Sequence, residues 1–418
     1  MSKNRAFLAF LYVLLGWVAV GQDRISSIKI AGVEKTKPDH LQQFIDLKPG
    51  DLLDSVQLEA NRQRLVNLEI LSNAKYEVTF TPEGAEVTFQ CFEVRTLLPL
   101  FNFGGVRDNF WFLIGATEVN LAGRGNKLLG YYQYYDRSSI ALSLTLDRIR
   151  QSKWGAQFNY VKWSTVEPLF FDGGTATYDY DNFTYGVSGL YHFNFRKSLE
   201  FNTSYFSEEY NRVDLNTIEG APQRAKTHKQ LFKLIYRARD LDYHFWYLSG
   251  ISNTTNAEAV LSYDGDPAFY IVFHDFQAYW RQGKYGNFAN RLRLGLATNR
   301  DSPFAPFVLD SYVNIRGVGN RVDRGTAMII MNNEYRHTLT NWNKIATQAV
   351  AFSDWGTWRL PGGELSDLSD ATHFEWFAGA GVRIIHKEIF NAVLRIDYGI
   401  NVLRKNSAGF VIGVGQYF

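Results

Sequence analysis

From Thr96 onward, alternating runs of apolar and polar residues follow one another to the last residue, and this pattern constrains the fold more than any other feature. The segment 140–149, IALSLTLDRI, has isoleucine or leucine at every second position from Ile140 to Leu146. The segment 391–402, NAVLRIDYGINV, alternates in the same way, with charged residues on its polar face. Because successive side chains of a strand point to opposite faces, each run predicts a strand with one apolar and one polar face.

A water-soluble sandwich would alternate in the same way, but three further features favour a transmembrane β-barrel. The runs are about 10–13 residues long, which is the length a tilted strand needs to cross a bilayer. Short turns, RQSK and RKS, alternate with longer connections, EEYNRVDLNTIEGAPQRAKTHK and RLPGGELSDLSDATH. Tyrosine and tryptophan recur near strand ends, and the chain closes on GVGQYF, an aromatic ending common in outer-membrane strands.

The runs predict sixteen strands, an even number as expected for a bacterial single-chain barrel. The strands are expected to begin near residues 97, 109, 126, 138, 152, 182, 198, 228, 243, 268, 286, 326, 343, 372, 389 and 408, with the segment 164–181 the least regular. The expected fold is mainly β: a 16-stranded antiparallel transmembrane barrel over residues 96–418, preceded by one small α/β domain. Such a barrel satisfies every backbone polar group internally, as lipid demands.

Residues 1–21 have the pattern of a secretory signal peptide. Lys3 and Arg5 precede an apolar run from Ala6 to Val20, which small residues follow. An uncleaved membrane anchor is the alternative, although the apolar run is short for a spanning helix. Removing Lys3 and Arg5 lowers Lys+Arg from 44 to 42 against 42 Asp+Glu, so the mature chain has no basic excess for binding nucleic acid.

Residues 22–95 predict a small α/β module. RISSIKIAGV reads as a strand, and a helix is expected to open near Pro38 and to close before Pro49. Asp54 resembles an N-terminal cap of a second helix, and two alternating runs joined at PEG predict a hairpin. The predicted order is strand, helix, helix, strand, strand.

No chemistry of catalysis or metal binding is evident in the sequence. Cys91 is the single cysteine, so no internal disulfide and no cysteine-based metal site can form; it is expected to pack as a small hydrophobe. There is no nucleophile elbow, no His–Glu metal motif and no phosphate-binding loop. We therefore expect a protein that is not an enzyme and that needs no cofactor or metal.

Two sets of motifs carry a resemblance to known families. IAGVEKT at 30–36 and RLVNLEILSN at 64–73 make the front module resemble a POTRA domain. The rest resembles the BamA/TamA-like outer-membrane assembly and translocation superfamily, through six short motifs in the same order: NLAGRGN at 120–126, IRG at 315–317, NNEYRH at 332–337, AFSDWG at 351–356, GAGVRI at 379–384 and LRIDYG at 394–399. The resemblance implies a short, single-POTRA member.

In this superfamily, a long extracellular loop folds back into the lumen and docks through a V/I-R-G-Y/F tip. The resemblance implies that Arg316 pairs with Glu334 and Asp354, because a buried arginine needs carboxylate partners. The tip would comprise Ile315, Arg316, Gly317 and Val318. Val318 stands where the family usually has an aromatic residue, and Tyr312 is the candidate to replace that residue. Arg383, Arg395 and Asp397 are expected only to line a wet lumen.

The seam between the first and last strands is expected to be weakly paired. Pro99 lies in the presumed first strand, where it cannot donate to the ladder, and Gly409, Gly413 and Gly415 interrupt the last strand. In the resembled insertases this seam opens and templates client strands. Ordinary turn and curvature chemistry is the alternative explanation for these residues.

The resemblance implies an outer-membrane assembly or insertion factor, which receives unfolded outer-membrane or secreted polypeptides at a POTRA domain in the periplasm. Its partners would be the outer-membrane bilayer, these clients, and accessory periplasmic proteins or lipoproteins. A two-partner-secretion-like transporter is one alternative, although such transporters normally carry two POTRA modules and a plug helix. A passive outer-membrane pore is another, although a pore needs neither a POTRA domain nor IRG.

Overall fold

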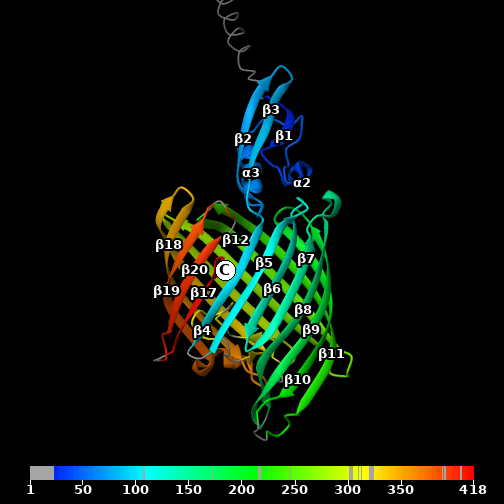
Figure 1. Cartoon of the computed structure of the whole chain (residues 1–418), viewed down its shortest axis with the longest axis vertical. Coiled ribbons are helices and arrows are strands. Elements are labelled where there is room, and N and C mark those ends of the chain that lie inside the picture. The colour runs from blue at the N-terminus through cyan, green and yellow to red at the C-terminus, as the bar shows by residue number, and fades with distance from the viewer. Residues whose placement is uncertain are drawn as a thin grey trace, which may run out of the picture.

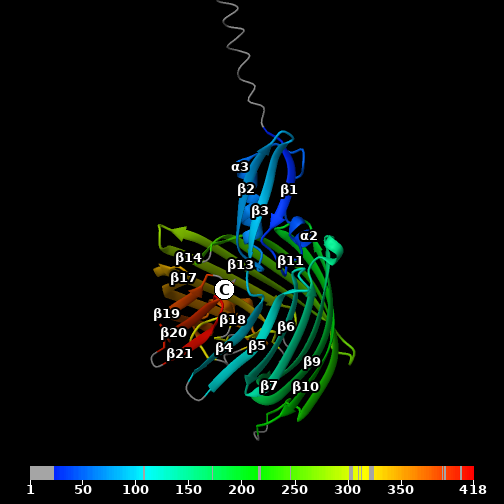
Figure 2. The same ribbon diagram turned by 45° about the horizontal axis from the view of Figure 1, so that its top comes forward.

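The computed structural model describes residues 23–418 apart from 107–108, 172, 215–217, 245, 301–304, 309, 312, 320–323, 388, 390–391 and 405–406. The expected signal peptide, residues 1–21, lies outside the described residues. None of the helices described is both long and apolar enough to span a membrane. The chain forms a small N-terminal domain that stands on one rim of a barrel, here called the near rim (Figure 1 and Figure 2).

The N-terminal domain packs two helices against a three-stranded sheet. Its elements are β1 (Ile25–Ala31), α2 (Pro38–Gln42), α3 (Ser55–Val66), β2 (Leu71–Thr81) and β3 (Gly84–Glu93), with sheet order β1–β3–β2. The predicted order of elements is confirmed, but α2 is shorter than expected. The chain leaves helical geometry after α2 and buries Phe44 and Leu47, while Asp46 N donates to Asn61 Oδ1 over 2.8 Å.

Helix α3 begins and packs as its sequence predicts. The carboxylate of Asp54 accepts a hydrogen bond from Val56 N at 2.9 Å, and Leu58 and Leu65 are buried against the sheet. Cys91 on β3 is fully buried in the same core, and this burial raises the pKa of its thiol to about 11. Cys91 therefore behaves as a packed hydrophobic residue rather than a reactive thiol.

Sixteen antiparallel strands form the closed barrel. They are β4 (Leu97–Val106), β5 (Asn109–Leu121), β6 (Asn126–Tyr135), β7 (Arg137–Leu146), β8 (Trp154–Phe171), β9 (Gly174–His192), β10 (Lys197–Arg212), β11 (Arg224–His244), β12 (Tyr247–Ser262), β13 (Phe269–Gln282), β14 (Gly286–Ala297), β17 (Ala327–Trp342), β18 (Ile345–Arg359), β19 (Phe374–His386), β20 (Val393–Asn401) and β21 (Ala408–Val414). Each strand pairs with its neighbours in the chain, and β21 closes the barrel on β4.

The strand count of sixteen is confirmed, and most strands begin within four residues of the predicted positions. The sixth barrel strand, β9, is the exception: it begins at Gly174 rather than near 182. The predicted long connection over 208–229 is also largely strand, because β10 runs to Arg212 and β11 starts at Arg224. In both places, polar and aromatic residues continue the ladder beyond the length that crosses a bilayer.

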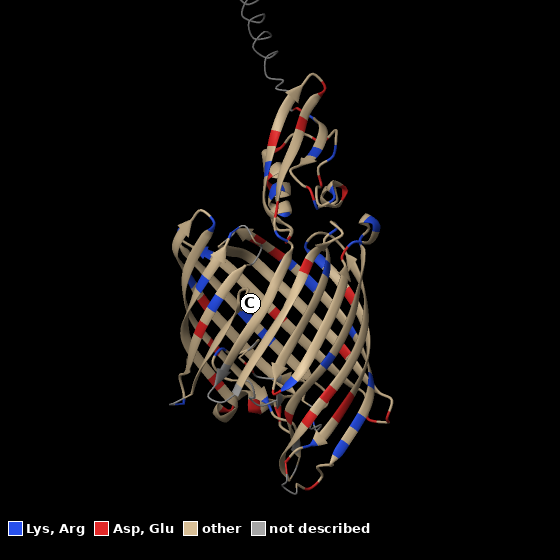
Figure 3. Cartoon of the chain, in the orientation of Figure 1, with Lys and Arg blue, Asp and Glu red and all other residues tan. Residues whose placement is uncertain are grey.

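The apolar face of the strands points outward and the polar face points into the lumen. On β7, Ile140 and Leu142 are 43% and 50% exposed, whereas Ala141 between them is buried. On β20, Ile396 is 47% exposed while Arg395 is 3% exposed. Figure 3 shows few charges on the front wall built by β5 and β6. An outward apolar band around a polar interior is the arrangement of a barrel that sits in lipid.

Strands β8–β11 project beyond the far rim of the barrel, the rim opposite the N-terminal domain (Figure 1). The projection has a small core of its own, in which Tyr178 and Leu169 are buried with Tyr210. The phenol of Tyr178 donates to Pro222 O at 2.7 Å, and this bond fastens the connecting loop over the core. The extended ladder is thus stable outside the apolar band.

The N-terminal domain docks on the turn between β5 and β6, residues 121–126. Lys37 N donates to Gly123 O at 2.9 Å, and Asn120 Nδ2 donates to Thr36 Oγ1 at 2.9 Å. Gly123 has φ +72°, and a Cβ there would lie 2.2 Å from Lys35 O. The glycine of the NLAGRGN motif therefore allows the two backbones to approach closely.

Two further contacts hold the domain over the lumen mouth. Asn67 Nδ2 donates to Asp242 Oδ1 at 3.0 Å and Asn67 Oδ1 accepts from Tyr243 N at 3.1 Å. The Phe44 ring lies 5.8 Å from that of Phe195, between centroids. The domain thus contacts three separate turns of the near rim.

We predict that Gly123→Ala undocks the domain from the β5–β6 turn, because the added Cβ collides with Lys35 O and the backbone has a left-handed φ. Hydrogen exchange at the amides of residues 35–37 should rise by at least about tenfold, the signature of local opening. Gly220→Ala is the matched control, since Gly220 has φ +77° but no neighbour within 4 Å. Equal exchange in both variants would contradict the docking role of Gly123.

A second prediction concerns His40, which is buried in the same contact. Burial lowers its pKa to about 4, although nearby Asp147 acts in the opposite direction, and its Nδ1 lies 2.7 Å from Gln43 Nε2. The pKa of His40 in the docked state lies below the ordinary value near 6.5. The contribution of neutral His40 to docking is therefore complete above pH 6.5 and is lost as pH falls toward 4. Spin labels at Val56→Cys and Trp342→Cys should report one distance at pH 7.5 and a broadened distribution at pH 4.5.

His40→Gln provides the control for this pH effect. Glutamine keeps a neutral polar side chain at position 40 and cannot be protonated in this range, so the distance distribution should become much less sensitive to pH. A pH dependence that is the same in His40→Gln as in the wild type would assign the effect to other groups.

Candidate functional site

The loop between β14 and β17 folds back into the lumen and carries the IRG motif, residues 315–317, to the inner wall. Its short strands β15 (Phe307–Val308) and β16 (Arg324–Gly325) pair with each other near the far rim. Deeper in the lumen, Ile315 N donates to Asp310 O at 2.9 Å and Val318 N donates to Ile315 O at 3.3 Å. These bonds form a tight turn that presents Arg316 to the inner wall. We call residues 310–319 the lid tip.

Arg316 forms a forked ion pair with Asp354 on β18. Its Nε lies 2.7 Å from Asp354 Oδ2 and its Nη2 lies 2.9 Å from Oδ1, while the backbone N–H of Arg316 also donates to Oδ2 at 3.1 Å. Arg316 Nη1 pairs with Glu334 on β17. The side chains of all three are fully buried. The geometry is the bidentate carboxylate recognition that only arginine provides.

Three charged residues that we expected only to line a wet lumen belong to this cluster. Arg383 Nη2 lies 3.3 Å from Glu334 Oε2, and its Nη1 lies 2.7 Å from Asp397 Oδ1. Arg395 Nη1 lies 3.6 Å from Asp397 Oδ2. The expectation was wrong because the lid tip excludes solvent there: Arg383 is 0% and Asp397 is 1% exposed.

Arg336 completes the cluster on the side of the near rim. Its Nε lies 2.5 Å from Glu334 Oε1, so Glu334 meets three arginines. Charges of both signs thus alternate through the buried lumen, and each carboxylate has at least one guanidinium partner. Removal of one member would leave each of its partners buried with one ion pair fewer.

Aromatic rings flank Arg316 even though Val318 follows Gly317. The guanidinium carbon of Arg316 lies 3.8 Å from the ring centroid of Phe352 on β18, a cation–π contact. Tyr312, the expected substitute aromatic, lies outside the described residues. Phe352 belongs to the AFSDWG motif, but its role could not be deduced from the sequence because its ring acts from the wall rather than from the loop.

The other residues of the tip make apolar and backbone contacts. Ile315 is fully buried in an apolar cluster with Phe377 and Trp358, and Val318 packs at its edge. Gly317 has φ +93°, and a Cβ there would lie 2.8 Å from Gly399 O on β20. Glycine is therefore required for the tip to lie flat against the wall.

The described residues hold no group of three or more His, Cys, Asp or Glu side chains arranged to bind a metal ion. The cluster around Arg316 consists of ion pairs between the lid tip and the wall.

The seam is the second element of the site, and its ladder is short. Strand β21 pairs with β4 over four register positions, from Phe410↔Gly105 to Gly413↔Asn102. On its other side, β21 pairs with β20 over seven positions. The stretch 97–101 of β4, which contains Pro99, has partners on β5 but none on β21 among the described residues.

The three glycines of the last strand have different surroundings. Gly409 lies opposite Gly399 in the ladder with β20. Gly413 lies under the side chain of Asn102, whose Oδ1 would be 1.6 Å from a Cβ at this position. Gly415 has φ +93° and lies just beyond the last strand residue, Val414.

Comparisons with known proteins identify the architecture. Residues 24–91 match the family model of the POTRA domain, described as "Surface antigen variable number repeat". The chain resembles the crystal structure of BamA from Haemophilus ducreyi lacking POTRA domains 1–3, with 14% identity, a TM-score of 0.56 and coverage of 94% of this chain and 85% of that chain. The chain has the POTRA-and-barrel fold.

Two CdiB structures have the same fold. CdiB from Acinetobacter baumannii gives a TM-score of 0.61 at 11% identity and covers 94% of this chain and 74% of that chain. CdiB from Escherichia coli gives 0.60 at 12% identity, with 94% and 77% covered. No curated protein matches the sequence. At these identities the resemblance carries the fold: one POTRA domain before a 16-stranded barrel.

We predict that Arg316→Ala destabilises the docked lid tip by about 3–5 kcal/mol, because Asp354 would lose its forked ion pair and Glu334 would lose one of its three arginine partners. Thermal unfolding in detergent and hydrogen exchange over residues 310–319 would measure the loss. Arg300→Ala is the control: Arg300 belongs to the same loop but pairs with Glu364 on the surface, where an ion pair contributes about 0–1 kcal/mol. Equal losses in the two variants would contradict a docking role for Arg316.

Proposed function

We propose that this protein is an outer-membrane assembly factor. In this proposal, the POTRA domain receives an unfolded polypeptide in the periplasm, and the β4–β21 seam pairs with a strand of that polypeptide in the bilayer. The short seam ladder is the observation that carries the proposal. Among the described residues, the stretch 97–101 of β4 has no partner on β21, and an unpaired edge is a ready template for strand addition.

The edges of the POTRA sheet support the first step. Strand β3 lies in the centre of the sheet, so β1 and β2 each have one edge without a partner in the described chain. Phe80 on β2 is 65% exposed, which gives this edge an apolar side chain for a client to contact. Accessory periplasmic proteins or lipoproteins would compete for, or extend, the same edges.

The filled lumen is evidence against a passive pore. The lid tip lies across the interior, with Ile315 and Arg316 fully buried, and the ion-pair cluster fastens it to β17 and β18. A two-partner-secretion-like transporter would move its polypeptide through this lumen and would have to release the tip during each passage. Insertion at the seam requires no such passage, because the client strand would pair with β4 at the wall and would not cross the lumen.

Cysteine crosslinking in cells tests the proposal. In a Cys91→Ser background, cysteines placed at Leu97 to Phe101 and at Phe410 should form disulfides with the terminal strands of newly made outer-membrane barrels. Leu142→Cys is the control, because Leu142 faces outward to a similar degree but lies on a strand with partners on both sides.

The outcomes separate the candidate functions. Client crosslinks at the seam and not at Leu142→Cys would support insertion. Crosslinks to a secreted chain from the lumen side of the wall, for example from Gln277→Cys, would replace insertion by translocation. A seam that captures no client while the wild-type protein is functional in the cell would overturn the assembly role.

A further inference from the structure

The last four residues leave the barrel wall and enter the lumen. The ladder of β21 ends at Val414, and Gly415, with φ +93°, turns the chain inward while its N–H still donates to Val393 O at 2.7 Å. Tyr417 beyond the turn is only 7% exposed. We had expected GVGQYF to end a wall strand on an aromatic residue, but the tail 415–418 packs inside the barrel.

The tail contacts the lid tip directly. Tyr417 Oη donates to Ser311 O at 3.1 Å, and the guanidinium carbon of Arg316 lies 4.5 Å from the centroid of the Tyr417 ring. Arg316 is thus held between two aromatic rings, that of Phe352 on the wall and that of Tyr417 on the tail. The phenol meets the loop backbone and the ring meets the loop cation, so the tail and the tip form one packed unit.

On its other side, Tyr417 contacts Arg395, which in turn binds the first barrel strand, β4. The guanidinium carbon of Arg395 on β20 lies 5.0 Å from the Tyr417 ring centroid, and Arg395 Nη2 donates to Asn102 Oδ1 at 3.2 Å. Asn102 belongs to β4, so this bond crosses over the last strand at Gly413. Because a Cβ at 413 would lie 1.6 Å from Asn102 Oδ1, the crossing requires glycine there.

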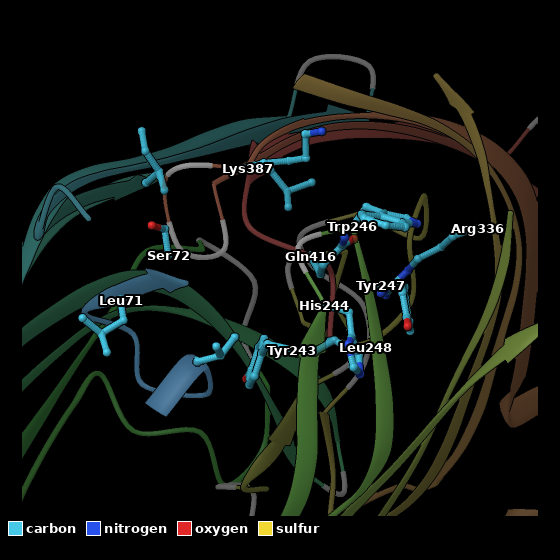
Figure 4. Close-up of a pocket in the computed structure, with 13 residues that line it drawn as sticks. Leu71, Ser72, Tyr243, His244, Trp246, Tyr247, Leu248, Arg336, Lys387 and Gln416 are labelled. Carbon is cyan, nitrogen blue, oxygen red and sulfur yellow. The ribbon is translucent and has the colours of Figure 1, made fainter. Parts of the chain in front are cut away.

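Neighbouring contacts position the tail for this role. Gln416 Oε1 accepts from Arg383 Nε at 3.3 Å, and the Phe418 ring lies 6.5 Å from that of Tyr279 across the lumen. Figure 4 shows Gln416 and Arg336 on the barrel side of a cavity of about 60 Å³, opposite Leu71 of the POTRA domain. The tail therefore lies where the lumen, the seam and the domain meet.

We propose that Asn102, Arg395 and Tyr417 form a latch that holds the seam closed while the lid tip is docked. Asn102 and Arg395 join β4 to β20 across β21, and Tyr417 joins Arg395 to the lid tip. The seam ladder has four backbone register positions, and the bond from Arg395 to Asn102 adds a side-chain contact that holds β4 to the last strands. Undocking the tip withdraws Ser311 and Arg316 from Tyr417 and frees Arg395 to leave Asn102.

The chemistry of Arg395 makes this latch releasable. Among the described residues, its Nε and Nη1 make no hydrogen bond, so Asn102 is its hydrogen-bond partner on another strand, and the Tyr417 ring supplies a cation–π contact. A guanidinium held by one amide oxygen, one ring and one ion pair at 3.6 Å is held less firmly than Arg316, with its forked bonds. The latch is accordingly the weaker part of the coupled cluster.

The latch would regulate the proposed insertion function. Its biological role rests on that function, but its existence does not. Its existence is testable without any client. The purified full-length protein in lipid nanodiscs is examined by hydrogen exchange over three segments: 102–105 and 410–413 at the seam, and 311–318 at the lid tip. Tyr417→Leu and Asn102→Ala should each raise exchange at both seam segments by about tenfold, as expected when a cation–π contact or a hydrogen bond to a charged group is lost.

The conservative variants distinguish a latch from a general loss of packing. Asn102→Asp keeps an acceptor for Arg395 and should keep the seam protected. Tyr417→Phe keeps the ring, loses only the bond to Ser311, and should expose the lid tip more than the seam. Tyr398→Leu is the outward-facing control on β20, because Tyr398 is 55% exposed. It should leave hydrogen exchange unchanged in all three segments.

Coupling is measured by the double variant Arg316→Ala/Tyr417→Leu. If the two residues act through one latch, the seam in the double variant exchanges no faster than in the faster single variant. Multiplied effects, or seam exchange equal to wild type in Asn102→Ala and Tyr417→Leu, would overturn the proposal. Neither result would change the interpretation of the client-crosslinking test. A failure to capture clients would not change the interpretation of the exchange results.

Discussion

A buried guanidinium between two carboxylates is the interaction on which the rest of the barrel depends. Arg316 reaches Asp354 and Glu334 only when the loop after β14 is folded inward; if the loop left, Asp354 would lose the forked pair and Glu334 would keep only its pairs with Arg336 and Arg383. The lumen is therefore filled by a segment whose position is determined by charge pairing rather than by apolar burial alone. Apolar contacts of Ile315 complete the fit, but the ion pairs determine where along the wall the tip docks.

The barrel must satisfy two opposing demands. Lipid requires that backbone polar groups be paired, yet, among the described residues, the stretch 97–101 of β4 has no partner on β21. Pro99 lies in this stretch and has no N–H, so it removes one donor that would otherwise face the bilayer unpaired. The inward turn at Gly415 shortens the ladder further, because it takes the tail away from the edge of β4. The backbone ladder of the seam is thus short, and the bond from Arg395 to Asn102 adds a side-chain contact to it.

Sequence patterns predicted the wall well and the interior only in part. Alternation of period two predicts the number of strands and the face to which each side chain points. It placed the start of β9 too late, because DYD and similar polar triplets continue the ladder outside the apolar band. The pairing of Arg316 with Glu334 and Asp354 was expected from the resemblance of the motifs. The contribution of Tyr417 was not, because it depends on an inward turn at Gly415 that has no periodic signature in the sequence. The burial of Arg383 and Arg395 was not expected either, because it depends on the lid tip that covers them.

The position of the POTRA domain gives these contacts a mechanical context. The domain docks on the turn after β5, and Lys35 Nζ lies 3.2 Å from Glu118 Oε2 on β5 itself. Strand β5 is the partner of β4, so the domain is fastened one strand away from the seam. A rotation of the domain would therefore pull on β5 and, through ten register positions, on β4. Because β4 is held more firmly by β5 than by β21, such a force would be relieved first at the seam, where the ladder is shortest.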